Sequence, residues 1–216
     1  MSKLQNIELF EGLSEEDLAT LEKLTVTRSY PKNTVLINEG DQANAMYFID
    51  NGKVRVYVSD DQGKEFILNT MGEGEYFGEL SLLDDEKRSA SVITTEKSAF
   101  SIIYKDDITD AIVNNPTLAL SLLKNLTSRV RQLTDNIKTL ALQDVYGRIR
   151  KTLMSLAEDE GDIQVVTEKL TQQDIANRIG SSREMVARIL KDLQIGGYIE
   201  SEKKQIRILK KLPESY

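Results

Sequence analysis

The sequence predicts an α+β protein in which a small β-barrel or roll comes first, a long helix follows, and a winged helix-turn-helix comes last. Three observations predict this order. Short apolar segments broken by turn residues recur between positions 33 and 105, an apolar seven-residue repeat follows Pro116, and two helical patterns meet at Gly180. The expected domains are the β-rich part, the long helix with its hinge, and the helix-turn-helix part, at residues 1–114, 115–143 and 144–216.

The N-terminal part is expected to begin with helices and continue as strands. Residues 5–30 predict one or two short helices, with Ser14 and Asp17 in a capping-box pattern before an apolar stripe. In residues 54–58, valine alternates with arginine and tyrosine, which is the pattern of a half-buried strand, and a polar turn follows at 60–63. Short strands separated by such turns indicate a small barrel or roll.

A glycine-rich stretch around Gly78 holds a candidate ligand site. Gly78 permits a tight turn, and the apolar residues 80–83 after it indicate a short helix whose first N–H groups would suit an anion. Arg88 and Ser89 add a guanidinium fork and a hydroxyl for a phosphate, whereas Glu79 repels phosphate and suits a sugar hydroxyl. A cyclic phosphate fused to a ribose would satisfy all of these groups. The alternative interpretation is an exposed hairpin with an incidental Arg–Glu pair.

Pro116 opens a long helix, since proline suits the first helical position. Apolar residues then follow in steps that alternate between four and three, which is a heptad seam. The seam consists of Ala119, Leu123, Leu126, Val130, Leu133, Ile137 and Leu140. A helix packed on its own roll could also be apolar along one stripe, but such a stripe is usually wider and less regular. The seam therefore favours a parallel dimer.

A hinge is expected at residues 142–144, between the long helix and the C-terminal part. Asp144 is a good N-cap for a helix over residues 145–156. The acidic stretch at 158–162 is expected to be a solvated loop with no chemistry of its own.

Two capped helices predict a helix-turn-helix. Thr171 and Asp174 form a capping-box pattern at the start of the first helix, and Gly180 can adopt the left-handed turn that ends it. Ser181 and Glu184 form a further capping-box pattern at the start of the second helix. Two helices joined by a tight glycine turn make this motif.

The exposed face of the second helix has the chemistry of a major-groove contact. Arginine can bond guanine at O6 and N7, glutamate can accept from cytosine N4, and Ala187 lets the backbone approach. Residues 196–209 predict a two-stranded wing whose lysines would contact phosphates. The alternative is a solvated helix with a Glu184–Arg188 pair. The candidate DNA contacts are Thr171, Ser182, Arg183, Glu184, Arg188, Lys203 and Lys204.

Composition narrows the functional classes. The net charge is −7, but residues 145–216 hold 13 Lys and Arg against 11 Asp and Glu, so basic charge is concentrated in the C-terminal third. The absence of Cys and His excludes disulfides, the usual zinc sites and histidine general bases. Because the chain shows neither a membrane-spanning apolar run nor the apolar core of a signal peptide, we expect a cytoplasmic protein.

Two sets of residues resemble a known family. Residues 77–80 with 88–90 resemble the phosphate-binding cassette of cyclic-nucleotide-binding domains, and residues 180–190 resemble the recognition helix of the cyclic-AMP receptor and fumarate–nitrate regulator family. The cassette, long helix and winged helix occur in that family's order over nearly the whole chain. The resemblance implies a double-stranded β-roll, a homodimer on palindromic double-stranded DNA with TGTGA-like half-sites, and RNA polymerase as a partner. The ligand residues it implies are Gly78, Glu79, Leu80, Arg88, Ser89, Arg129, Leu133 and Thr134.

One position departs from the family pattern. In the cyclic-AMP receptor branch, two adjacent hydroxyl residues on the long helix meet the adenine, whereas this chain has Leu133 followed by Thr134. One hydroxyl is therefore kept and the other is replaced by an apolar contact. The resemblance still implies a ribose cyclic phosphate, while the base of the ligand is less well defined.

The sequence thus predicts a homodimeric transcription regulator that responds to cyclic AMP and uses no cofactor, metal or catalytic residue. Rival hypotheses keep the fold and the DNA but replace the ligand by cyclic GMP, cyclic di-GMP or another anion, or need no ligand. An enzyme acting on a nucleotide would lack a histidine, a metal cluster and a nucleophile–base pair. A purely architectural DNA binder would leave the cassette unexplained.

Overall fold

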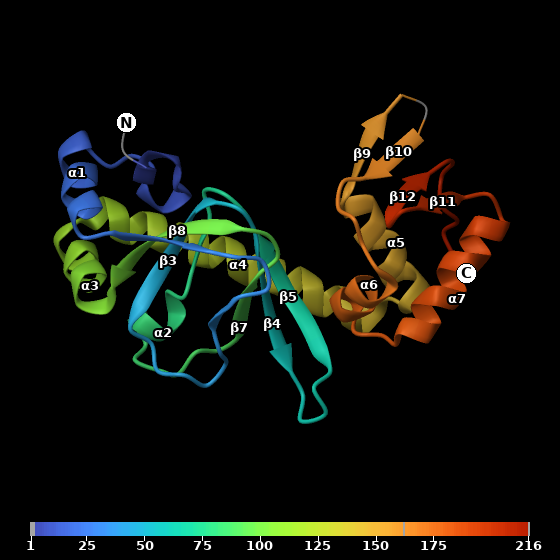
Figure 1. Ribbon diagram of the computed structural model, residues 1–216, viewed down its shortest axis with the longest axis horizontal. Coiled ribbons are helices and arrows are strands. Elements are labelled where there is room, and N and C mark those ends of the chain that lie inside the picture. The colour runs from blue at the N-terminus through green and yellow to red at the C-terminus, as the bar shows by residue number, and fades with distance from the viewer. Residues whose placement is uncertain (1–2, 162, 216) are drawn as a thin grey trace. The chain divides into compact units, whose positions relative to one another are not determined.

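The computed structural model describes residues 3–161 and 163–215, and the chain divides into two compact units. Residues 1–58 and 67–131 make the first unit, and residues 59–66 and 132–216 make the second. Figure 1 shows a β-rich N-terminal part, the long helix α4, and a C-terminal part of three helices with a small sheet. The predicted α+β class and the order of its parts are therefore confirmed.

Two four-stranded sheets form the β-roll. One has the order β1-β8-β3-β6 and consists of β1 (Val26–Tyr30), β8 (Ser98–Tyr104), β3 (Ala45–Asn51) and β6 (Tyr76–Phe77). The other has the order β2-β7-β4-β5 and consists of β2 (Val35–Ile37), β7 (Ser91–Thr94), β4 (Val54–Ser59) and β5 (Glu65–Met71). The pairs β1–β8, β3–β8, β3–β6, β2–β7 and β4–β7 are antiparallel. Most neighbours in these two sheets are distant in sequence, and only β4 and β5 follow each other along the chain.

The roll has an aromatic and aliphatic core to which both sheets contribute. Phe77 and Phe100 meet edge to face with ring centroids 5.8 Å apart, and Tyr47 stacks on Phe77 at 5.1 Å. A second core joins the N-terminal segments to the roll. In this core, the ring centroids of Phe10 and Phe48 lie 4.9 Å apart. Each fully buried ring of this kind contributes about 1.5–3 kcal/mol to stability. Phe77 belongs to the cassette, which therefore joins directly onto this packed core.

The N-terminal helices end earlier than the sequence indicated. Two 3₁₀ turns, Lys3–Asn6 and Glu8–Phe10, precede α1 (Glu15–Lys23), and the Ser14 side chain caps α1 by accepting from the Asp17 N–H at 3.1 Å. The prediction of helix up to residue 30 is wrong, because residues after α1 form β1 and pair with β8 from Val26↔Ile102 onward. These residues are β-branched or aromatic in part, and strand pairing outweighs the helical pattern.

Three helices complete the first unit and lead out of it. They are the short α2 (Leu80–Leu83), α3 (Lys105–Asn114) and the long α4 (Pro116–Leu142). Pro116 is the first residue of α4, as predicted. The Asn115 side chain accepts from the N–H groups of Thr117 and Leu118, both at 3.1 Å, and so satisfies two donors that the helix start leaves unpaired.

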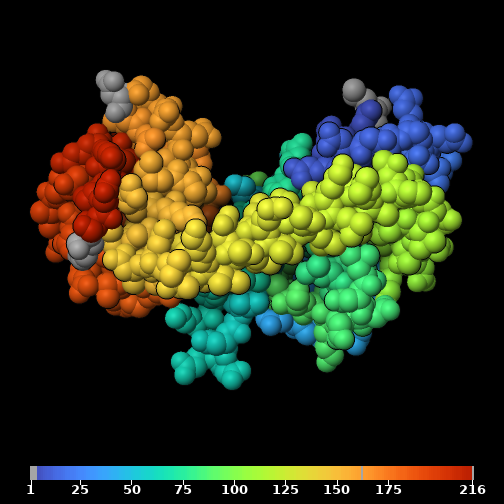
Figure 2. Space-filling model, turned by 180° about the vertical axis from the view of Figure 1, so that it is seen from behind, coloured from blue at the N-terminus to red at the C-terminus, as the bar shows by residue number. Residues whose placement is uncertain are grey.

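α4 has two apolar sides with different surroundings. Leu118 and Leu122 are buried in the core beneath the roll, and Leu126 packs partly against it. Five of the seven seam positions are instead exposed: Leu123, Val130, Leu133, Ile137 and Leu140. Figure 2 shows α4, coloured yellow-green to gold, at the surface in that view. The core of the single chain therefore does not account for the seam.

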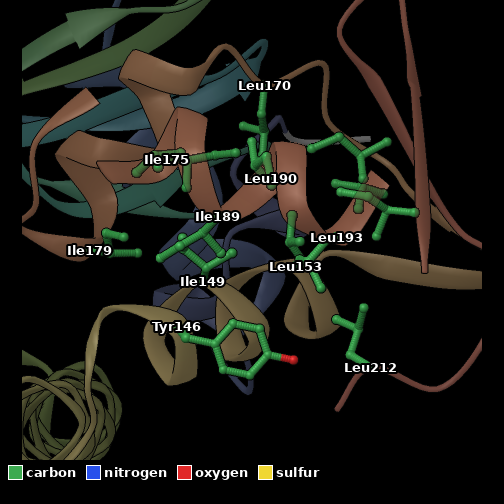
Figure 3. Packing of buried hydrophobic residues seen from close by; sticks show 14 of the residues in the cluster. Tyr146, Ile149, Leu153, Leu170, Ile175, Ile179, Ile189, Leu190, Leu193 and Leu212 are labelled. Atoms are coloured by element: carbon green, nitrogen blue, oxygen red, sulfur yellow. The ribbon is translucent and has the colours of Figure 1, made fainter. Parts of the chain in front are cut away.

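The second unit packs three helices against a small sheet. Its helices are α5 (Val145–Ser155), α6 (Gln172–Ile179) and α7 (Arg183–Ile195). Its sheet has the order β11-β12-β10-β9, from β11 (Ile199–Glu202), β12 (Gln205–Ile208), β10 (Ile163–Val166) and β9 (Ala157–Glu160). Figure 3 shows how side chains of all three helices converge, including Ile149, Ile175 and Ile189, each at most 2% exposed.

The start of α5 lies where the sequence predicted it, whereas the acidic stretch after α5 is partly a strand. Asp144 caps α5 as predicted, accepting from the Gly147 N–H at 2.7 Å. The loop expected at 158–162 is wrong for its first residues, because they belong to β9, which pairs with β10 in the register Ile163↔Glu160; residue 162 itself lies outside the described residues. Pairing with a neighbouring strand overrides the low strand propensity of acidic residues.

Among the described residues, no helix has the length and apolarity needed to cross a bilayer.

Candidate functional site

Gly78 shapes the cassette at the point where β6 gives way to α2. Its φ is +85°, and a Cβ added there would lie 2.9 Å from the Arg88 Nη1 and 3.3 Å from the Ala45 carbonyl oxygen. Only glycine fits this conformation and this space without strain. The turn places Glu79 at the N-cap of α2, where its carbonyl accepts from the N–H of Leu82 at 3.0 Å.

Arg88 is buried beside this turn, at 5% exposure. Its Nη1 donates to the Gly78 carbonyl and its Nη2 to the Ala45 carbonyl, each at 2.7 Å. Burial lowers the pKa of Arg88, and neighbouring groups that include Glu79 oppose the shift. A guanidinium carries five N–H donors, so these bonds fix the orientation of Arg88 and use two of the five.

Glu79 is the second buried charged residue of the cassette, at 3% exposure, and it pairs with α4. Arg129 forms an ion pair with the Glu79 carboxylate through Nη1, and its Nη2 donates to the Tyr76 carbonyl at 2.6 Å. Its guanidinium also lies over the Tyr76 ring, 4.7 Å from the centroid. Burial raises the pKa of Tyr76 to about 12, and the charge of Arg129 opposes this shift. One arginine thus connects α4 to the cassette by three contacts.

The predicted ligand residues divide into two groups. Gly78, Glu79, Arg88 and Arg129 are brought together in the first unit by the contacts described above. The remaining four are exposed, with Leu80 and Ser89 in the cassette and Leu133 and Thr134 further along α4. Leu133 is 48% exposed in the single chain.

The helix-turn-helix is closed by local hydrogen bonds. The Thr171 side chain accepts from the Asp174 N–H at 3.1 Å, and the Asp174 carboxylate accepts from the Thr171 N–H at 2.9 Å, so the predicted capping box is confirmed. Gly180 ends α6 in the left-handed region, with φ 63° and ψ 42°.

The N-cap of α7 is Ser182, whose side chain accepts from the Met185 N–H at 3.2 Å. The capping box expected from Ser181 is wrong. The Ser181 N–H donates to the Ala176 carbonyl at 3.1 Å, and Ser181 therefore belongs to the turn that closes α6.

α7 buries one face and exposes the other. Its buried residues are Val186, Ile189, Leu190 and Leu193. Arg183, Glu184 and Arg188 are exposed, and Ala187 between them is partly buried. Within residues 3–161 and 163–215, no ion pair joins Glu184 to Arg188, so the solvated-pair interpretation has no support from the contacts.

The wing tip lies next to the start of α6. Lys203 and Lys204 form the turn between β11 and β12, with φ of 49° and 69°. The Leu170 N–H donates to the Lys204 carbonyl at 3.1 Å, and the Gln205 side chain donates to the Val166 carbonyl at 2.5 Å. These bonds hold the wing lysines close to the segment that precedes the Thr171 cap.

The comparisons with known proteins identify both parts of the chain. Residues 27–115 match the family described as "Cyclic nucleotide-binding domain", and residues 147–211 match "Crp-like helix-turn-helix domain". The chain is 34% identical over 205 residues to the CRP-like cAMP-activated global transcriptional regulator of Mycobacterium tuberculosis H37Rv, covering 93% of this chain and 91% of the relative. The chain belongs to the CRP/FNR family of transcription regulators.

A second relative and one solved structure are also similar to this chain. The cAMP-activated global transcriptional regulator CRP of Haemophilus influenzae is 36% identical over 184 residues, which is 82% of this chain and 81% of the relative. The structure of the c-di-GMP-responsive regulator CLP of Xanthomonas campestris matches with a TM-score of 0.82 over 92% of this chain and 100% of that chain. At 23% identity, this second likeness shows the fold alone. As a CRP/FNR member, the chain is a DNA-binding transcription regulator and not an enzyme.

Sequence reasoning about this CRP/FNR chain overlooked two basic residues of the second unit. Lys169 and Arg207 line the same surface hollow as Lys203. Lys169 stands two positions before the Thr171 cap, and Arg207 alternates with the buried Ile206 and Ile208 on β12. The position of Lys169 beside a capping box could have indicated it from the sequence. The alternation of polar and apolar residues on β12 could have indicated Arg207.

Proposed function

We propose that this regulator is a homodimer whose DNA binding is controlled by cyclic AMP. The observation that carries the proposal is the pair of buried, opposite charges around Gly78. Glu79 and Arg88 are 3% and 5% exposed and lie on either side of the same turn. Their own contacts hold them in place, and together they offer an acceptor and a set of donors to a ligand that needs both. Two relatives, one at 34% and one at 36% identity, carry the description cAMP-activated, which supports the same ligand.

In this proposal, each cassette group has one part of the ligand to bind. A ribose hydroxyl donates to the Glu79 carboxylate, which can accept at the oxygen that the Arg129 ion pair does not use. Arg88 and Ser89 contact the phosphate, Gly78 and Leu80 provide the close backbone of the turn, and Arg129 adds positive charge nearby. Leu133 and Thr134 contact the base, the first by apolar contact and the second by its hydroxyl.

The dimer in this proposal uses the exposed seam of α4. Leu123, Val130 and Ile137 are at least 60% exposed in the single chain, which is unusual for large aliphatic residues spaced at heptad intervals. A second copy of α4 packed in parallel would bury them. The two helix-turn-helix units would then be related by a two-fold axis, which suits a palindromic site.

On DNA, α7 is proposed to read bases while its surroundings hold the phosphates. Arg183, Glu184 and Arg188 present guanine- and cytosine-directed groups, whereas the Thr171 and Ser182 hydroxyls can bond phosphates. Lys203 and Lys204 add sequence-independent attraction at the wing. RNA polymerase is the proposed protein partner, and the cytoplasm is the proposed location.

Isothermal titration of the full chain with cyclic AMP, cyclic GMP, cyclic di-GMP and AMP tests the ligand. We expect heat from cyclic AMP, and a ten- to hundredfold weaker affinity for Ser89→Ala, about 1.5–3 kcal/mol for a lost bond to a charged group. Ser29→Ala makes the same change at an exposed serine on β1 and serves as the control. Equal affinity in the two variants, or no heat from any cyclic nucleotide, would refute the proposed site.

Cyclic GMP is the second candidate ligand because of one residue. Leu133 provides no hydroxyl for an adenine amine, so the preference between the two bases is expected to be weaker than two hydroxyls would give. Stronger heat from cyclic GMP than from cyclic AMP in the same titration would favour this candidate.

A further inference from the structure

The recognition helix α7 carries a methionine whose sulfur contacts an arginine proposed to read a base. The Arg188 Nη2 donates to the Met185 Sδ at 3.0 Å. The two residues are three positions apart on α7 and therefore lie on the same side of the helix. Met185 is partly buried and packs against the core of the second unit, whereas Arg188 is exposed. Met185 is therefore the more restrained of the two side chains.

The contact suits a residue that must stay available to a base. A thioether is a weak acceptor, so it restrains the guanidinium without competing strongly with guanine. Glu184 is one turn before Arg188 and could hold it more firmly, but within residues 3–161 and 163–215 no ion pair joins them. Only one guanidinium nitrogen, Nη2, donates to sulfur, and four of the five N–H donors of Arg188 are outside this bond.

We propose that Met185 is a positioning residue that orients Arg188 toward the base pair it reads. The inference rests on the proposed reading of DNA by α7. An exposed arginine loses side-chain freedom when it binds a base, and a neighbour that has already restricted the side chain reduces that loss. The expected contribution of Met185 is about two- to tenfold in discrimination at one base pair.

The test compares variants of the full chain with cyclic AMP present. Selection from a random DNA pool gives the preferred site, and Arg188→Ala shows which base pair loses its preference. Affinities are then measured by fluorescence anisotropy for that site and for single-base changes at this position and at the others. Met185→Leu keeps the volume and removes the acceptor, and Met185→Gln provides an oxygen acceptor. Met154→Leu, at a methionine that is 41% exposed on α5, is the matched control.

We expect Met185→Leu to lower discrimination about two- to tenfold at the Arg188 base pair alone, with Met185→Gln and Met154→Leu within about twofold of the parent protein. A uniform loss at all base pairs would assign Met185 to packing and overturn the inference, as would discrimination equal to that of the parent. Equal losses in Met185→Leu and Met185→Gln would show that the acceptor is irrelevant. If Arg188→Ala changes no base preference, the proposed role of Arg188 fails independently of Met185.

Discussion

Replacing Arg129 by methionine tests the connection between α4 and the cassette. Glu79 is 3% exposed and pairs with Arg129, whose side chain is 28% exposed. Removing one partner of a buried ion pair costs about 3–5 kcal/mol, because the other charge stays buried without compensation. Water can reach the Arg129 position in part, which places the expected cost below that range, at about 2–3 kcal/mol. The bond to the Tyr76 carbonyl is lost as well.

The assay is denaturant unfolding of the full chain at pH 7, with thermal unfolding as a second measure. A loss of about 2–3 kcal/mol should lower the midpoint temperature by roughly 5–10 °C for a unit of this size. Arg131→Met is the matched control, since Arg131 is exposed two positions further along α4.

A double-mutant cycle isolates the pair from other effects. Arg129→Met combined with Glu79→Gln should be more stable than the sum of the single changes predicts, by at least about 1 kcal/mol. The reasoning is refuted if Arg129→Met unfolds within about 0.5 kcal/mol of Arg131→Met at pH 7, or if the cycle shows no coupling.

Three further predictions concern the dimer, the ligand base and the wing. Leu123→Asp with Ile137→Asp should give a monomer in analytical ultracentrifugation, because charges would have to be buried in the seam; an unchanged mass would place the interface elsewhere. Leu133→Thr should favour cyclic AMP over cyclic GMP by about 0.5–1.5 kcal/mol more than the parent protein does, and an unchanged ratio in competition assays would show that this position does not contact the base. Loss of Lys203 and Lys204 should weaken binding to all DNA sequences alike and reduce the slope of log affinity against log salt, whereas a changed base preference would contradict a phosphate role.

The sequence was most informative where interactions are local. The Ser14, Asp144 and Thr171 caps each involve residues no more than three positions apart, and all three were predicted in place. Pro116 and Gly180 act through their own backbone conformations, so the start of α4 and the end of α6 were also predictable. The one cap that was misplaced, at Ser181, had an equally good neighbour in Ser182, and the closing turn of α6 decided between them.

Strands that depend on distant partners were harder to predict. β1 follows a helix and none of its five residues is buried, and it exists because β8, more than 60 residues later, offers an edge to pair with. β9 consists mainly of acidic residues that indicate a loop in isolation, yet its backbone pairs with β10. The hydrogen bonds of a sheet belong to two segments at once, and a pattern within one segment does not contain the other.

For the candidate site, the sequence alone indicated which residues have the chemistry for a ribose cyclic phosphate and for DNA. Those candidates were identified by residue type and by spacing along the chain, and both can be read without a structure. Tertiary structure decided how they are engaged. It directs Arg129 to Glu79 across 50 positions, turns the donors of Arg88 onto the Gly78 and Ala45 carbonyls, and leaves the α4 seam exposed. Each of these outcomes is a choice among partners distant in sequence, and only the folded chain sets the distances that favour one partner over another.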